Sequence, residues 1–207
     1  MDATNPNNWL FWLQLLNSRE PVNGLVALQA QGLLPPELLA LVGCKQNPQH
    51  HPEGDAWQHT LLVVSEARRC LHNVPIQWQT AFMFGALLHD VGKPLVVNPE
   101  TLDMHGHAAA GEAPARAFLQ RIGAGEDITA KIIAIVINHM GVSGNRQAKE
   151  KAWLKLHERL PLNVGAPLAA CDKSSSTGVH VDDPNFKYEA SEIAMRYLAV
   201  FEGGGRK

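Results

Sequence analysis

The residues best suited to chemistry are His89 and Asp90, an adjacent imidazole and carboxylate. They end the apolar segment 77–90, which the sequence pattern predicts to be a buried central helix. Burying either side chain without a partner is costly, so the fold must supply one. A divalent cation satisfies both groups, because neutral imidazole nitrogen and carboxylate oxygen are metal ligands. The pair therefore indicates half of a metal site.

Four further candidate ligands lie on other expected helices. His59 and His139 each share a helical face with apolar residues three or four positions away, so both should point inward. His107 begins an expected helix, and Asp172 lies within an apolar helical run. A single inward histidine is usually a hydrogen-bonded core residue, but several helices that each direct such a group inward indicate a metal centre. His105 is the alternative to His107, and His107 and His139 could instead support the ligands or contact substrate.

The chemistry of these ligands restricts the metal. Imidazole nitrogens and carboxylate oxygens without a thiolate suit an octahedral Mn, Fe, Ni, Co or Mg ion better than structural zinc. His59, His89, Asp90 and Asp172 would leave two coordination positions for water and a phosphoryl oxygen. One or two divalent ions are expected, and Asp90 is the natural bridge because a carboxylate has two oxygens.

Three basic residues are candidates for binding a substrate phosphate. Gly92 lets the chain turn sharply after the central helix, which would place the Lys93 ammonium behind the metal. Asp90 and Lys93 are therefore the expected catalytic residues, although Lys93 could instead pair with an acidic residue. Lys173 and Arg146 are weaker candidates, since each is in a position typical of a surface charge.

Helical periodicity extends along the whole chain and predicts an all-α protein. Only 95–97 suggests a strand. One domain is expected over residues 1–202, with a helical lead-in (1–48), a metal-site core (49–185), a C-terminal helix (186–202) and a disordered tail (203–207). The expected helices are 9–16, 21–31, 36–42, 55–72, 77–90, 107–122 with a kink at Pro114, 127–140, 146–160, 165–175 and 186–202.

Composition narrows the function classes. The net charge of −2 gives no general attraction to nucleic acid, so any RNA contact must be local. Three cysteines without a CxxC pair fit a reducing compartment. No apolar run reaches the length of a membrane span, so a cytoplasmic protein is expected. The aromatic cluster of Trp9, Phe11 and Trp12 is expected to cover the core, with a homodimer contact as the alternative.

These residues also carry a resemblance to a known family. His59, His89-Asp90 and Asp172 follow the H…HD…D signature of the HD-domain metal-dependent phosphohydrolases. Segments 51–62, 86–93 and 105–107, and the lead-in 25–49, resemble the HD domain of bacterial tRNA nucleotidyltransferases (CCA-adding enzymes). The resemblance spans about 25–172 and implies an HD-domain helical bundle. The Gly-Ser strand motif with paired aspartates that nucleotide addition needs is absent from the sequence, and Lys173-Ser-Ser-Ser replaces an arginine- and glycine-rich stretch.

The ligand set and the resemblance together predict a metal-dependent phosphohydrolase. It would cleave phosphomonoesters or phosphodiesters, with nucleotides (including 2′,3′-cyclic nucleotides) as the expected small phosphorylated substrates, by a metal-activated water. Two alternatives stay open. One is a catalytically silent module that binds nucleotides or RNA ends, and the other is a di-iron HD-type oxygenase.

Overall fold

The computed structural model describes residues 5–142, 156–189, 191–192, 194–195 and 198–199. Within these residues every regular element is a helix, which confirms the expected all-α bundle. The elements are α1 (Trp9–Asn17), α2 (Pro21–Ala30), α3 (Pro36–Leu39), α4 (Ala56–Cys70), η1 (Leu71–Asn73), α5 (Ile76–Leu88), α6 (Lys93–Val96), α7 (His107–Ala110), α8 (Glu112–Ile122), α9 (Glu126–Asn138), η2 (His139–Val142) and α11 (Leu162–Ser175).

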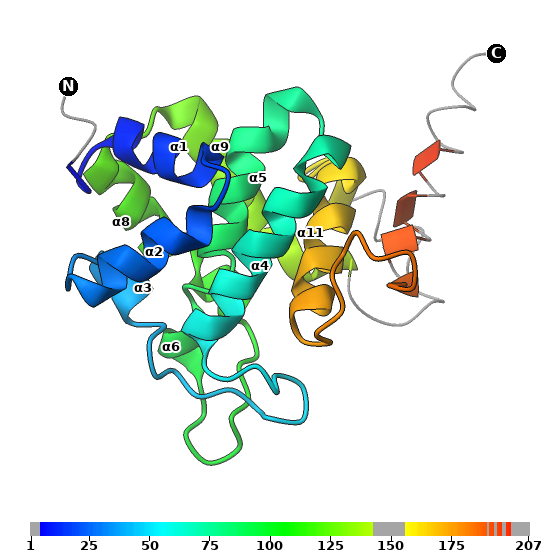
Figure 1. The fold of residues 1–207 in the computed structure, drawn as a ribbon, viewed down its shortest axis with the longest axis horizontal. Coiled ribbons are helices and arrows are strands. Elements are labelled where there is room, and N and C mark those ends of the chain that lie inside the picture. The colour runs from blue at the N-terminus through cyan, green and yellow to red at the C-terminus, as the bar shows by residue number, and fades with distance from the viewer. Residues whose placement is uncertain (1–4, 143–155, 190, 193, 196–197, 200–207) are drawn as a thin grey trace.

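Helix α5 is the centre of the bundle. Every side chain from Ala81 to Leu88 is buried, so this helix is apolar on all sides, as expected of an interior helix. It packs against α4 and α9, and α4 in turn packs against α2 and α11. Figure 1 shows α4 between α2 and α11. The C-terminal end of α5 therefore lies deep in the protein, where His89 and Asp90 follow it.

Close packing of α5 on α9 depends on Gly85. A methyl group on Gly85 would lie 2.4 Å from Cγ2 of Ile135, so the isoleucine occupies the space that a side chain would need. This contact fixes the spacing of the two helices whose ends bear His89 and His139.

The N-terminal aromatic residues cover the core, as expected. The rings of Trp9 and Phe84 stack with centroids 4.6 Å apart, and Trp12 meets Phe118 edge to face at 5.0 Å. Trp12 is fully buried, and its indole N–H donates to the carbonyl of Pro6. Aromatic pairs of this geometry stabilise a fold beyond their burial alone.

Some local expectations were wrong. The segment 95–97 is not a strand, because Lys93–Val96 form the short helix α6 with a proline at its start. The helix expected over 107–122 is divided at Gly111 into α7 and α8 rather than kinked at Pro114. Pro114 lies in the first turn of α8, where a missing N–H costs nothing. Leu62, the apolar residue three positions after His59, was expected on the inward face of α4 but is 40% exposed.

Several expectations fall outside the described residues. Arg146 and most of the helix expected over 146–160 belong to the range 143–155, and the tail 203–207 is likewise not described. Only part of the helix expected over 186–202 is described. Among the described residues no helix is both long enough and apolar enough to cross a membrane.

Candidate metal centre

His59 lies in the first turn of α4, and the start of this helix fixes its position. Asp55 is the N-cap, and its side chain accepts from the backbone N–H of Gln58. The imidazole of His59 is fully buried. Its Nδ1 lies 2.7 Å from Oε1 of Glu53 and 3.1 Å from Oγ of Ser175. These contacts leave Nε2 to face the other candidate ligands.

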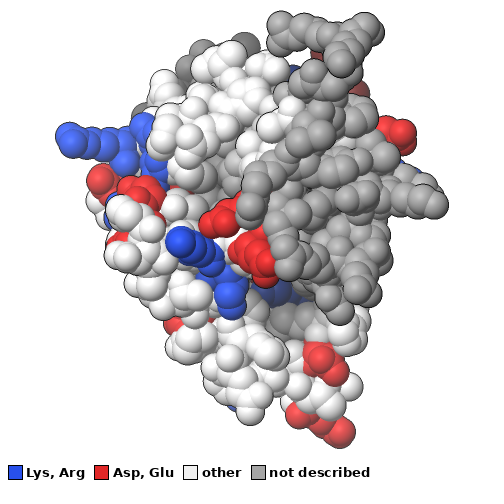
Figure 2. Space-filling view, turned by 90° about the vertical axis from the view of Figure 1, so that its right-hand side faces the viewer, with Lys and Arg blue, Asp and Glu red and all other residues white. Residues whose placement is uncertain are grey.

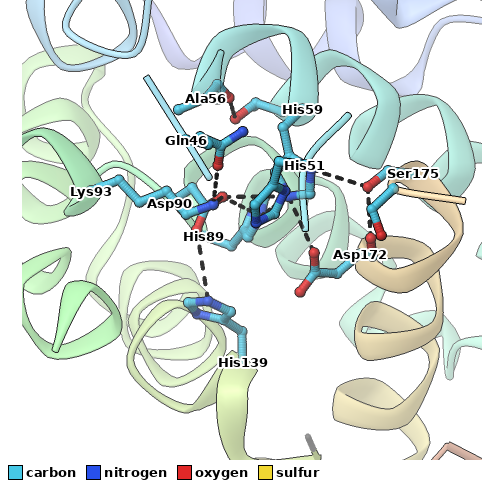
Figure 3. Close-up of polar contacts among 12 residues, drawn as sticks. Gln46, His51, Ala56, His59, His89, Asp90, Lys93, His139, Asp172 and Ser175 are labelled. Carbon is cyan, nitrogen blue, oxygen red and sulfur yellow. Dashed lines mark hydrogen bonds and ion pairs between the residues drawn. The ribbon is translucent and has the colours of Figure 1, made fainter. Parts of the chain in front are cut away.

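The first cluster forms where α4, the end of α5 and α11 meet (Figure 3). Nε2 of His59 lies 3.4 Å from Nε2 of His89 and 3.1 Å from Oδ1 of Asp172. Nδ1 of His89 donates to the carbonyl of Ala86 at 2.9 Å, so its Nε2 also points inward. Oδ2 of Asp90 lies 3.1 Å from Nε2 of His89. Residues far apart in the sequence thus bring ligand atoms to one point.

The second cluster shares Asp90 with the first. Its other oxygen, Oδ1, lies 3.3 Å from Nε2 of His107 and 3.8 Å from Nε2 of His139. These two Nε2 atoms are 3.0 Å apart. Nδ1 of His107 donates to the Met104 carbonyl at 2.8 Å, and Nδ1 of His139 donates to the Val136 carbonyl at 2.7 Å. Asp90 therefore directs one oxygen at each cluster, the position required of a bridging ligand.

The donor set fits divalent cations. In all four imidazoles Nδ1 is engaged by a carbonyl or carboxylate, so that Nε2 is the nitrogen presented inward. This is the usual arrangement of metal-binding histidines, in which an outer hydrogen bond fixes ring orientation. Imidazole nitrogens face each other at 3.0 and 3.4 Å, and the buried Oδ2 of Asp90 makes ion pairs but no hydrogen bond. Among the described residues three groups could thus hold a metal ion: His59–His89–Asp172, Asp90–His107–His139, and His51–Glu53–His59, which shares His59 with the first.

The electrostatics of the first cluster favour a protonated His59 when no cation is present. Burial lowers the pKa of His59, but hydrogen bonds with Asp172 and Glu53 outweigh burial and raise the pKa to about 9. Burial raises the pKa of Asp172, yet the hydrogen bond and charge of His59 hold it well below the usual range. A proton on His59 therefore occupies the place that a cation would take.

The second cluster is neutral at its histidines. Burial lowers the pKa of His139 to about 4, with a further contribution from the nearby His89. Burial also lowers the pKa of His107. Asp90 stays ionised, because the charges of His89 and Lys93 overcome the effect of burial and hold its pKa well below the usual range. Two neutral imidazoles beside a carboxylate are ready to bind a cation without losing a proton.

The raised pKa of His59 predicts how the stability of the metal-free protein depends on pH. The folded-state pKa lies above the ordinary value of 6.5, so this group stabilises the fold fully below pH 6.5 and ceases to do so as pH rises to about 9. The shift corresponds to on the order of 3 kcal/mol. Urea unfolding in EDTA should show this loss between pH 6.5 and 9. The His59→Gln variant should lack this component, and an identical pH dependence in both proteins would contradict the assignment.

The Lys93 side chain is buried and paired, unlike a lysine that is free to bind a phosphate. Its ammonium lies 2.6 Å from Oδ2 of Asp90 and 2.5 Å from Oε1 of Gln46 (Figure 3). The structure therefore shows the pairing with an acidic residue, while Lys93 also lines the adjoining cavity. Gly92 does not adopt a left-handed conformation there, since its φ is −84°, so its role is close packing rather than an unusual turn.

The other three residues proposed for the site from the sequence are His105, Lys173 and Arg146. His105 lies away from both clusters with its side chain 95% exposed, so His107 is the histidine that reaches Asp90. Lys173 is exposed and lines only a smaller cavity beside Asp172. Arg146 lies outside the described residues.

Three site residues were not identified from the sequence: Gln46, His51 and Ser175. His51 and Gln46 lie on a loop, where helical periodicity gives no direction. The only available signal for His51 was its place in the 51–62 segment. Ser175 follows Asp172 by three positions on α11, which does indicate a shared face.

A cavity of about 600 Å³ opens onto the two clusters. Its wall combines Asp90, His107, His139 and Asp172 with apolar side chains of the 102–109 segment and of 137–140. A second cavity of about 180 Å³ shares Asp172 and His139 with the first and is also lined by Tyr188. Volumes of several hundred Å³ are typical of small-molecule sites.

Comparison with known proteins identifies relatives of this chain. No protein-family profile matches it. A multifunctional CCA protein of Actinobacillus pleuropneumoniae is 30% identical over 176 residues, which are 83% of this chain and 42% of that protein. The CC-adding tRNA nucleotidyltransferase of Thermus thermophilus is 33% identical over 197 residues, 91% of this chain and 42% of that protein. A multifunctional CCA protein of Azoarcus sp. is 30% identical over 173 residues, with 78% and 40% coverage.

The all-α fold and the arrangement of its histidines and aspartates are those of an HD-domain protein. Within that class, the chain belongs with the HD-domain portion of the multifunctional CCA proteins and the CC-adding tRNA nucleotidyltransferases. It spans about two fifths of the length of the curated relatives it matches.

Proposed function

We propose that this protein is a metal-dependent phosphohydrolase that cleaves phosphomonoesters or phosphodiesters of nucleotides, including 2′,3′-cyclic nucleotides. The observation that carries the proposal is the pair of ligand clusters joined by Asp90 at the wall of a large cavity. A substrate phosphate in this cavity would lie against both clusters.

The residues that would hold the cations follow from the geometry. His59, His89, Asp172 and Asp90 would hold one cation, and His107, His139 and Asp90 would hold the other. The donors suit Mn, Fe, Ni, Co or Mg. When bound, divalent cations supply Lewis-acid activation of water and neutralise charge on a phosphoryl group.

The protein's own groups prepare the site for this chemistry. Asp90 is kept ionised and is held by the Lys93 ammonium, which fixes the orientation of its two oxygens. Because Lys93 also lines the cavity, its charge can stabilise a bound phosphate while it remains paired. Lys173, at the smaller cavity, is the proposed second contact. The carbonyls that accept from His89, His107 and His139 keep these rings from rotating.

The cavity also suits the nucleoside part of such a substrate. Leu102, Met104, Ile137 and Met140 provide apolar surface, and Gln46 and Asn47 provide polar groups. The name of the Thermus thermophilus relative refers to tRNA, so the end of an RNA is a second source of the same phosphate group. Figure 2 shows acidic and basic side chains interspersed on the coloured part of the face that it presents, without a broad basic surface among the residues drawn in colour.

Hydrolysis of 2′,3′-cyclic AMP by the purified protein tests the proposal. We expect turnover with Mn²⁺, Co²⁺, Ni²⁺ or Mg²⁺, and none in EDTA. Asp172→Asn removes one anionic ligand from the first cluster and should lower kcat/KM at least about 100-fold, because ligand geometry and charge set the affinity of the site. Asp127→Asn, an exposed residue on α9, is the matched control. Full activity of the Asp172→Asn variant, or turnover that survives EDTA, would refute the proposal.

A further inference from the structure

Glu53 and His51 form, with His59, a third group of possible ligands beyond the two clusters joined by Asp90. One carboxylate oxygen of Glu53, Oε1, lies 2.7 Å from Nδ1 of His59 and 2.9 Å from Nδ1 of His51. The two imidazole rings meet edge to face with centroids 4.8 Å apart. A single oxygen therefore accepts from both histidines and fixes the position of one ring relative to the other.

The two histidines differ in what they face. His59 is fully buried and turns Nε2 toward Asp172 and His89. His51 is 24% exposed and lines both cavities beside the clusters. With Nδ1–H donated to Glu53, the Nε2 of His51 has no hydrogen-bonding partner among the described residues. It is thus available to a bound molecule.

Glu53 itself cannot contact that molecule. Its side chain is only 6% exposed, and it lines neither of the two cavities. Its second oxygen is buried without a hydrogen bond. A buried carboxylate oxygen without a hydrogen bond destabilises the fold. The other oxygen of Glu53 orients His51 and His59 together, which gives this buried carboxylate a role in the site.

We infer that His51 is a substrate-contacting residue of the proposed phosphohydrolase site and that Glu53 is the positioning residue that aligns it with the ligand His59. The inference rests on the proposed function for the identity of the substrate. His51 Nε2 would bond a hydroxyl or a phosphoryl oxygen of the nucleotide at the junction of the two cavities. Glu53 would act only through the two rings.

Metal affinity separates the two roles. We expect His51→Ala to bind Co²⁺ within about threefold of the unaltered protein and with the same visible absorption spectrum. Glu53→Ala should weaken Co²⁺ binding about 10–100-fold, the usual effect of removing the outer partner of a ligand histidine. Glu53→Gln keeps an oxygen that can accept from both rings, so it should retain most of the affinity and the spectrum. His72→Gln, which changes an exposed histidine of η1 just after the end of α4, is the control.

Substrate recognition is measured in the same proteins. His51→Ala should raise KM for 2′,3′-cyclic AMP, or weaken binding of 2′-AMP to the Co²⁺-loaded protein, about 10–100-fold. In the Glu53→Ala background the same change should have an effect of less than about threefold, because His51 is no longer aligned. In this double-mutant cycle, if Glu53 had a merely structural role, the effects of His51→Ala and Glu53→Ala on substrate affinity would be additive.

The outcomes distinguish this inference from the proposed function. If no nucleotide is hydrolysed, the phosphohydrolase proposal fails, while Co²⁺ and 2′-AMP binding still decide the roles of Glu53 and His51. The inference is overturned if His51→Ala loses Co²⁺, which would make His51 a ligand. It is also overturned if His51→Ala binds 2′-AMP like His72→Gln, or if Glu53→Ala keeps full Co²⁺ affinity.

Discussion

Replacing Asp90 with asparagine should abolish phosphohydrolase activity, with a loss of at least about 1,000-fold in kcat, and should empty both ligand clusters together. Asp90 is the one residue that directs an oxygen at each described cluster, through Oδ2 to His89 and through Oδ1 to His107. Asparagine has nearly the same shape, but its side chain offers a metal only one oxygen, which is uncharged. Without the cations, the charge that develops on the phosphoryl group would not be stabilised. Such stabilisation usually lowers the barrier by several kcal/mol.

Metal content after dialysis, measured by inductively coupled plasma mass spectrometry, and kcat are the two measurements for Asp90→Asn. Because the change also leaves the buried Lys93 without its anionic partner, circular dichroism should first establish that the variant is folded. Lys93→Met in the Asp90→Asn background removes that unpaired charge and should restore stability without restoring metal. If Asp90→Asn keeps the metal content of the unaltered protein, Asp90 is not a bridging ligand.

The second large effect concerns Gly92. A methyl group there would lie 2.1 Å from the carbonyl oxygen of His107 and 2.5 Å from the backbone nitrogen of Gly111. These neighbours are main-chain atoms, so α7 would have to move as a unit and would take His107 away from Asp90. We expect Gly92→Ala to cost about 3 kcal/mol, at the upper end for an overpacked interior. For a chain of this size that corresponds to a fall in Tm of about 6–12 °C.

Gly92→Ala should also remove the second cluster selectively. His59, His89 and Asp172 do not depend on α7, so the variant is expected to keep the first ion while losing the second. Differential scanning calorimetry and metal titration check the two parts. Gly125→Ala is the control, because a methyl group at Gly125 meets nothing within 4 Å. A Tm within about 2 °C of the unaltered protein would show that α7 yields more easily than its packing implies.

The sequence predicted the inward direction of the candidate ligands better than it predicted the residues that surround them. Helical periodicity gives a direction to every residue on a helix, and so the inward position of His59, His139 and Asp172 could be inferred before any coordinates. His107 was chosen over His105 because it begins a helix. The structure brings all of these residues to Asp90 or to His89.

Residues on loops and at helix junctions could not be inferred in this way. His51 contributes to the site from a loop, where side-chain direction depends on tertiary contacts alone. The sequence left the partner of Lys93 open between a substrate phosphate and an acidic residue, and only the distances to Asp90 and Gln46 show the pairing. The break at Gly111 depends on close packing against Gly92, a contact between separate segments that local propensity does not contain.

The ligand groups come from the end of the central helix and from helices that precede and follow it in the chain. In an extended chain these groups are too distant from each other to chelate anything together. Under the proposed function, cation uptake and folding would form a single linked equilibrium, in which ions would stabilise the native state in proportion to the logarithm of their concentration. Chelators should therefore lower the thermal resistance of the whole protein, and an isolated fragment ending before α11 should lack the high-affinity site.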